Sequence, residues 1–310
     1  MITDFGYKHL TGLAWLFSLI AITLVTLLVI RKKFNKGESY DRAVVRYICY
    51  FMWAWEIIKT VRMINYPDYG PVGYYPLWMA PFHICSMGLY AYLIIGSKKD
   101  SKLKEWVKPF GFATMLIVTM IILIIPASSG IMGIVDNWSF CFDNILPYQS
   151  FLYHGCLVLV PLYMVISGFY RPKWSDIYKA ATVLLVCATC AYGLNYLFEG
   201  SGADYMMLRY GNGNPFVGIL QTNPVLYYIL MGAVGIGGTS VVLSITILIR
   251  KLVCRKTTTQ TTTTTDVAFE TITKSNNEIE LKLDETVKIT ISKTTKSTTS
   301  KRKTTKEAVK

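Results

Sequence analysis

Apolar runs of membrane-spanning length recur along most of this 310-residue chain. A run of about 20 apolar residues is long enough to cross a bilayer as a helix. Short polar segments separate the runs, so the pattern predicts an all-α, polytopic membrane protein. Seven transmembrane helices are expected, at residues 11–30, 43–64, 74–96, 107–125, 148–169, 177–198 and 224–250.

Lysine and arginine residues fall into every second segment between the predicted helices. Residues 31–42 and 97–108 each hold five of them, whereas residues 65–73 and 126–147 hold none. Basic segments of membrane proteins stay in the cytoplasm. The pattern therefore predicts a multi-pass protein of the cell membrane with its N-terminus outside and its C-terminus in the cytoplasm. The net charge of +13 follows from this topology, and no nucleic-acid partner is expected.

The composition changes abruptly at Thr257. The stretch "TTTQTTTTTD" begins there, and residues 257–310 are rich in threonine and lysine. Such a segment buries too little apolar surface to offset its chain entropy. Two regions are therefore expected: a seven-helix transmembrane domain, residues 1–256, and a disordered cytoplasmic tail, residues 257–310.

Ionisable and strongly polar residues are few inside the predicted helices, and each is a candidate for function because burying it in hydrocarbon is costly. The predicted topology places all of them in the outer half of the membrane or at its midplane. We therefore expect them to line one cavity that opens to the outside. The set consists of Glu56, Lys59 and Arg62 in the second helix, His83 and Cys85 in the third, His154 in the fifth and Asn195 in the sixth.

A structural role is the alternative for several members of this set. Glu56 and Lys59 are i,i+3 neighbours and can neutralise each other. Arg62 can extend toward the outer interface, and Asn195 can form an interhelical hydrogen bond. A lone histidine such as His154 is often packed and satisfied within the core.

The segment "PFHICSMGLY", residues 81–90, carries a histidine and a cysteine two positions apart. On a regular helix such residues point about 200° apart, so they face one substrate atom only if Pro81 distorts the helix. A cysteine nucleophile needs a base, and both His83 and His154 qualify. Zinc ligands on one helix are normally i,i+3 or i,i+4 apart, so the i,i+2 spacing speaks against a zinc site. No metal and no cofactor are expected.

Three stretches together resemble the YwaF family of multipass membrane proteins: "PLWMAPFHICSMGLY", "NYLFEGSGADYMMLRYGNGNP" and "PVLYYIL", with His154 between the first two. The resemblance covers about residues 10–250. It departs at Asp204-Tyr205, where the family has Asn-Tyr, and at the longer "GNGN" of residues 211–214. The Thr-rich tail is not a family feature.

The animal relatives of that family include a phospholipid acyltransferase that works through a cysteine and a histidine. The resemblance therefore implies that Cys85 takes the acyl chain, with His83 or His154 as its base. The partners would be membrane lipids, namely a phospholipid acyl donor and a lysophospholipid acceptor.

The remaining polar residues of the set would bind the substrate. Glu56 and Lys59 would orient a polar head group, and Arg62 would pair with a phosphate. Asn195 and Tyr205 complete the expected substrate-binding residues. The alternative hypothesis is a transporter or receptor-like binding protein with an outward-facing cavity and no chemistry. A scaffold protein in lipid homeostasis is a third possibility.

Overall fold

The computed structural model describes residues 7–65, 72–124, 145–211 and 216–275, and these ranges contain helices and no strand. The chain forms two compact units, Met1–Leu248 and Ile249–Lys310. The prediction of an all-α protein is thus confirmed over the described residues. The helical elements are α1 (Tyr7–Lys33), α2 (Glu38–Asn65), η2 (Leu77–Met79), α3 (Met87–Ile95), α4 (Lys102–Pro109), η3 (Phe110–Thr114), α5 (Met115–Ile124), α8 (Ile145–Ile166), α9 (Asp176–Leu197), η5 (Tyr205–Met207), α10 (Val217–Thr222) and α11 (Pro224–Ser275).

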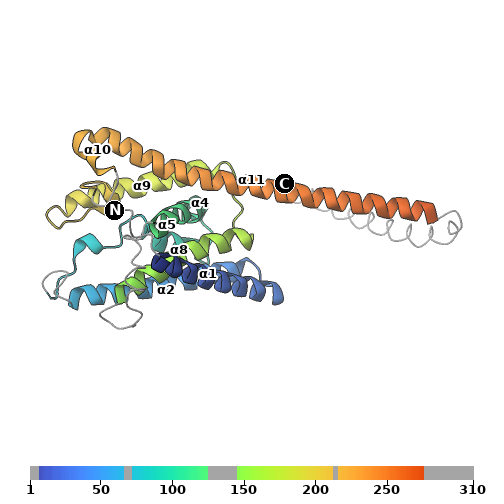
Figure 1. The fold of residues 1–310 in the computed structure, drawn as a ribbon, viewed down its shortest axis with the longest axis horizontal. Helices are drawn as coiled ribbons and strands as arrows, with labels where there is room; N and C mark the ends of the chain where they lie inside the picture. Colours follow the sequence, from blue (N-terminus) through green and yellow to red (C-terminus); the bar gives the residue numbers. More distant parts are fainter. Residues whose placement is uncertain (1–6, 66–71, 125–144, 212–215, 276–310) are drawn as a thin grey trace, which may run out of the picture. The chain divides into compact units, whose positions relative to one another are not determined.

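Helix α8 is the centre of the first unit, because it packs against α1, α2 and α5 (Figure 1). Tyr92 of α3 is fully buried beside it and donates a hydrogen bond to the Gly111 carbonyl oxygen over 3.2 Å. Gly96 lets the end of α3 approach α2 closely. A Cβ atom at Gly96 would lie 2.8 Å from the backbone nitrogen of Arg46, which is closer than packed atoms come.

Helices α4 and α5 form one continuous span through a π-helical turn, η3. The Ser101 side chain caps the start of α4 by accepting from the Lys104 backbone N–H over 3.2 Å. Pro109 ends α4, because proline lacks a backbone N–H and cannot continue the regular hydrogen-bond pattern. The wider turn η3 takes up this interruption without ending the span.

Five described helices are long and apolar enough to cross a membrane: Leu10–Lys33, Lys102–Leu123, Tyr148–Ile166, Asp176–Leu197 and Pro224–Val253. They match the first, fourth, fifth, sixth and seventh predicted runs. The second run is also a helix, α2, but its charged residues lower its mean hydropathy. Seven spans therefore remain a prediction, and five candidates are established by length and composition.

The third predicted run, residues 74–96, is not one helix. The sequence pattern suggested a continuous span, but only η2 and the 9-residue α3 are helical, and residues 80–86 form turns. The physical reason is the pair Pro76 and Pro81, since each lacks a backbone N–H and its ring clashes with a preceding helical turn. A helix of nine residues is about 14 Å long, about half the hydrocarbon core of a bilayer.

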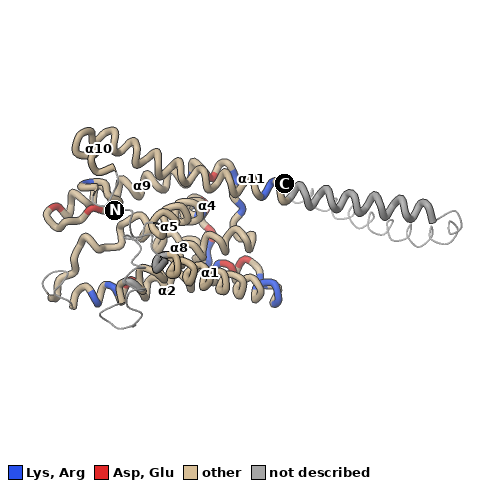
Figure 2. Tube along the Cα trace, in the orientation of Figure 1, with Lys and Arg blue, Asp and Glu red and all other residues tan. Residues whose placement is uncertain are grey.

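The predicted basic segments 31–42 and 97–108 lie at one end of the first unit, together with the link after α8. Arg31 forms an ion pair with Asp41 at 2.7 Å, and the Tyr163 hydroxyl donates to the same carboxylate over 2.6 Å. Arg42 pairs with Asp100 at 2.6 Å, which joins residues 31–42 to residues 97–108. Lys108 stacks over the Phe169 ring at 4.6 Å, which adds the segment after α8. Figure 2 shows this end, where α1 finishes and lysine and arginine residues gather.

The last helix continues beyond the predicted transmembrane domain. α11 extends to Ser275, so the first residues of the expected disordered tail are helical in the structure. From residue 276 onward the predicted tail lies outside the described residues.

Candidate functional site

His83 and Cys85 lie in the turns between η2 and α3. The Phe82 N–H bonds the Ala80 carbonyl over 2.7 Å, and the Met87 N–H bonds the His83 carbonyl over 3.2 Å. Regular helical geometry, which would separate the two side chains by about 200°, therefore does not apply to this segment. Pro81, which the sequence marked as a possible distortion, lies within these turns, two residues before His83.

The His83 ring is held on two sides. Its Nε2 lies 3.1 Å from the Trp78 carbonyl oxygen, and its ring centroid lies 5.5 Å from that of Tyr205 in an edge arrangement. A carbonyl oxygen only accepts hydrogen bonds, so this contact assigns the proton to Nε2 in the neutral ring. Nδ1 then carries the lone pair that accepts a proton.

Tyr205 connects this segment to α9. Its hydroxyl donates to the Leu77 carbonyl over 2.5 Å, and its backbone exchanges two hydrogen bonds with the Asn195 side chain, at 2.6 and 3.0 Å. Both residues are fully buried. Burial raises the pKa of the Tyr205 phenol above its ordinary value, so the hydroxyl stays protonated and donates. The structure joins these two residues to each other, and their expected role in substrate binding stays a prediction.

Replacing Tyr205 with phenylalanine should loosen the turns that hold His83 and Cys85. The change removes the hydroxyl and its hydrogen bond, so the Leu77 carbonyl keeps only the bond from the Ala80 N–H, at a cost of about 0.5–1.5 kcal/mol. The backbone bonds to Asn195 remain. Hydrogen exchange of the full-length protein in micelles should rise in residues 77–86 and stay unchanged in α8. Equal protection in variant and wild type would contradict this role, and Tyr192→Phe, an exposed tyrosine of α9, is the control.

Glu56 and Lys59 form an ion pair within α2, as the structural alternative anticipated. Their side chains are 6% and 12% exposed. The Lys59 ammonium also donates to the Met79 carbonyl over 3.2 Å, so the pair anchors the end of η2. Arg62 lies one turn further along α2 and is also buried, at 4% exposure.

Cys85 is partly buried. It is contacted from α8 by Tyr153, which the sequence analysis did not identify. The Tyr153 hydroxyl donates to the Cys85 carbonyl oxygen over 3.4 Å. Tyr153 is itself 3% exposed. Its position next to His154 was the available signal, because a tyrosine beside a candidate histidine extends the same polar patch.

His154 lies one residue further along α8 and is 7% exposed. Its Nδ1 lies 2.6 Å from the Ser150 carbonyl oxygen, which assigns the proton to Nδ1. Its Nε2 is buried and has no hydrogen-bond partner among the described residues. His154 is thus a second neutral base, but its described contacts join it to its own helix and not to the Cys85 side chain.

A second polar group, which the sequence analysis did not predict, surrounds Asn195. Arg209 donates to the Asn195 carbonyl over 2.5 Å and pairs with Glu199. The Arg209 backbone N–H donates to the Asp204 carboxylate over 2.9 Å. Arg209 is the only basic residue between 199 and 223, and that isolation was a signal in the sequence. These bonds shape the chain around Tyr205.

Most residues of the predicted set therefore belong to one connected cluster. Hydrogen bonds and ring contacts connect Lys59, His83, Tyr205 and Asn195, with Glu56 joined through Lys59, and Cys85 lies on the same turns. His154 contacts the ring of the neighbouring Tyr153 at 5.7 Å between centroids, and the Tyr153 hydroxyl bonds the Cys85 carbonyl. Among the residues that the structure describes, no three His, Cys, Asp or Glu side chains group as a metal site would require.

Fold and site together define an all-helical membrane protein with a polar cluster among its helices. A family model matches residues 5–248, and the chain belongs to the TMEM164 family. This finding confirms a family of membrane proteins, while the YwaF name drawn from the motifs stays a prediction. Comparison with curated proteins and with solved structures gave no match.

Proposed function

We propose that this protein moves a fatty-acyl chain between phospholipids through a thioester on Cys85. The observation that carries the proposal is the placement of Cys85 and His83 on the turns that follow η2, because three parts of the fold hold η2 and these turns in place. Lys59 of α2 bonds Met79, Tyr153 of α8 bonds Cys85, and Tyr205 bonds Leu77. A nucleophile and a base on a segment fixed in this way are what covalent catalysis requires.

The reaction has two balanced halves. In the first, the histidine takes the Cys85 proton, sulfur attacks the ester carbonyl of a phospholipid, and a C–S bond replaces the C–O bond. The histidine returns the proton to the glycerol oxygen, which leaves as a lysophospholipid. In the second, the hydroxyl of another lysophospholipid attacks the thioester, and the proton returns to sulfur. Attack by water instead would make the protein a lipid hydrolase.

His83 is the base that we favour. Its hydrogen bond to Trp78 directs the lone pair to Nδ1, and it stands two residues from Cys85 on the same turns. His154 has a lone pair on a buried Nε2, but its described contacts do not reach the Cys85 side chain. His154 is therefore the alternative base.

The other residues of the cluster position the reacting segment or the lipid. Lys59, paired with Glu56, holds η2, and Asn195 holds Tyr205. Arg62 is proposed to pair with a lipid phosphate. The basic end of the first unit would face the cytoplasm by the positive-inside rule, so the Cys85 segment would open toward the outer half of a cell membrane.

The test is to trap the thioester. Purified full-length protein, incubated with a phospholipid carrying a labelled acyl chain, should gain one acyl mass on the peptide that contains Cys85. The adduct should disappear with neutral hydroxylamine and on addition of a lysophospholipid, which should take up the label. A label found only on Cys190, an exposed cysteine of α9, would show non-specific acylation and reject the proposal.

The two histidines are compared in the same assay. His83→Gln should slow adduct formation by about a hundred-fold or more, which is the typical contribution of a general base, whereas His154→Gln should leave most of the rate. The reverse result would assign the base to His154.

A further inference from the structure

A second candidate site lies at the basic end of the first unit, away from the Cys85 segment. A cavity of 520 Å³ opens there between α2 and the end of α3. Arg46 and Lys98 line it, together with Tyr47, Tyr50 and Ser97. Tyrosines beside cations are typical of the level at which a membrane meets water.

The two cations of this cavity have no carboxylate partner among the described residues. Nearby basic residues differ, because Arg31, Arg42 and Lys104 each pair with an aspartate. One nitrogen of the Arg46 guanidinium donates to the Gly96 carbonyl over 3.3 Å, which orients the group and leaves its other donors unused. Lys98 is exposed. The cavity therefore offers two positive charges to an anion.

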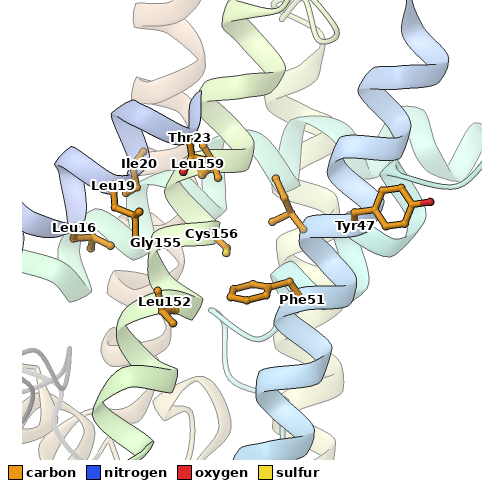
Figure 3. A pocket seen from close by; sticks show the side chains of 11 residues that line it. Leu16, Leu19, Ile20, Thr23, Tyr47, Phe51, Leu152, Gly155, Cys156 and Leu159 are labelled. Carbon is orange, nitrogen blue, oxygen red and sulfur yellow. The ribbon is translucent and has the colours of Figure 1, made fainter. Parts of the chain in front are cut away.

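An apolar cavity of 380 Å³ lies on the other side of Tyr47, between α1, α2 and α8. Its walls include Leu16, Ile20, Phe51 and Leu152. Figure 3 shows Phe51 turned toward α8, whereas the Tyr47 ring points away from this cavity. Tyr47 thus lines both cavities, and its ring centroid lies 5.8 Å from the Arg46 guanidinium carbon.

We infer that the two cavities together form a binding site for an anionic membrane phospholipid. Arg46 and Lys98 bind the phosphate, and one acyl chain passes Tyr47 into the apolar cavity. The combination of adjacent cationic and apolar cavities matches an amphiphile better than a soluble anion, and α1 and α8, which flank the apolar cavity, are candidate membrane spans. Basic pockets between transmembrane helices commonly bind acidic head groups. This site is independent of the chemistry at Cys85.

Lipid binding to the full-length protein tests the inference. The probe is an ether-linked phosphatidylglycerol, which has no ester for Cys85 to attack, and binding is measured in detergent by native mass spectrometry. Arg46→Gln combined with Lys98→Gln should weaken binding by about thirty-fold, because each cation near an acidic lipid contributes about a factor of five. Thr23→Phe, which fills the apolar cavity, should also weaken it.

The matched control is Lys99→Gln combined with Lys102→Gln, which removes the same charge from exposed positions of the same end. This control double variant should bind the probe nearly as well as the wild-type protein does. Equal weakening by both pairs would mean general attraction to the surface and would overturn the inference. Unchanged binding in Thr23→Phe, or competition by glycerol 3-phosphate as strong as by the lipid, would also overturn it, since the acyl chain would then contribute nothing.

Discussion

Replacing Cys85 with alanine is expected to abolish acyl transfer. Without the thiol no thioester forms, and loss of a covalent nucleophile typically lowers the rate by at least about a thousand-fold. The protein should still fold, because Cys85 is partly buried and its contact with Tyr153 uses the backbone carbonyl. The measurement is the initial rate of label transfer from a phospholipid to a lysophospholipid in reconstituted vesicles.

The control for this variant is Cys187→Ala. Cys187 lies on α9, is also partly buried and also packs at the edge of the main apolar cluster, so it reports the effect of losing a thiol from the packing alone. It should keep nearly full activity. A Cys85→Ala protein with more than about a tenth of the wild-type rate would exclude the thioester route, since residual catalysis without a nucleophile is far lower. Transport or binding without chemistry would then be the better explanation of the cluster.

The largest expected loss of stability comes from Lys59→Met. This change leaves the Glu56 carboxylate buried without its cation and removes the bond to Met79. Removing one partner of a buried ion pair costs about 3–5 kcal/mol, because the remaining charge is neither hydrated nor paired. The measurement is the midpoint of unfolding by denaturing detergent in mixed micelles, followed by tryptophan fluorescence.

Two further variants show whether the buried charge is the cause. Replacing both Glu56 and Lys59 with methionine should recover most of the lost stability, because no unpaired charge remains. Lys179→Met breaks a pair of the same i,i+3 spacing on α9, but Asp176 keeps hydrogen bonds from Tyr170 and the Lys173 backbone. It should therefore cost less than Lys59→Met. A double variant as unstable as Lys59→Met would show that Glu56 is not the source of the loss.

Hydropathy predicted the helices well where a run was free of dense charge, and α8 is continuous although Pro161 lies inside it. α1, α8 and α9 match their predicted runs within a few residues, because length and hydropathy are local properties of a segment. The prediction of a continuous helix over the third run was wrong, and the reason is also local. Its average composition satisfied the hydropathy criterion, but Pro76 and Pro81 interrupt the backbone hydrogen bonds within it.

The candidate site was predicted less completely than the helices. Membership of the polar cluster followed from the cost of polar groups in hydrocarbon, which selected His83, Cys85 and Lys59. The hydrogen bonds within the cluster could not be predicted from the same argument. Tyr205 meets Leu77 across 128 positions of the chain, and Tyr153 meets Cys85 across 68, and no periodicity within a single segment specifies such a partner.

The sequence by itself therefore determined an all-helical membrane protein, the clustering of basic residues between its helices and the short set of residues suited to chemistry. Only the tertiary structure decided that Asn195 and Tyr205 bond each other, that His83 and Cys85 lie on turns, and that Arg46 and Lys98 face one cavity. The physical reason is the range of the interactions. Burial and helix formation depend on neighbouring residues, whereas a hydrogen-bonded cluster or a cavity depends on how distant segments pack.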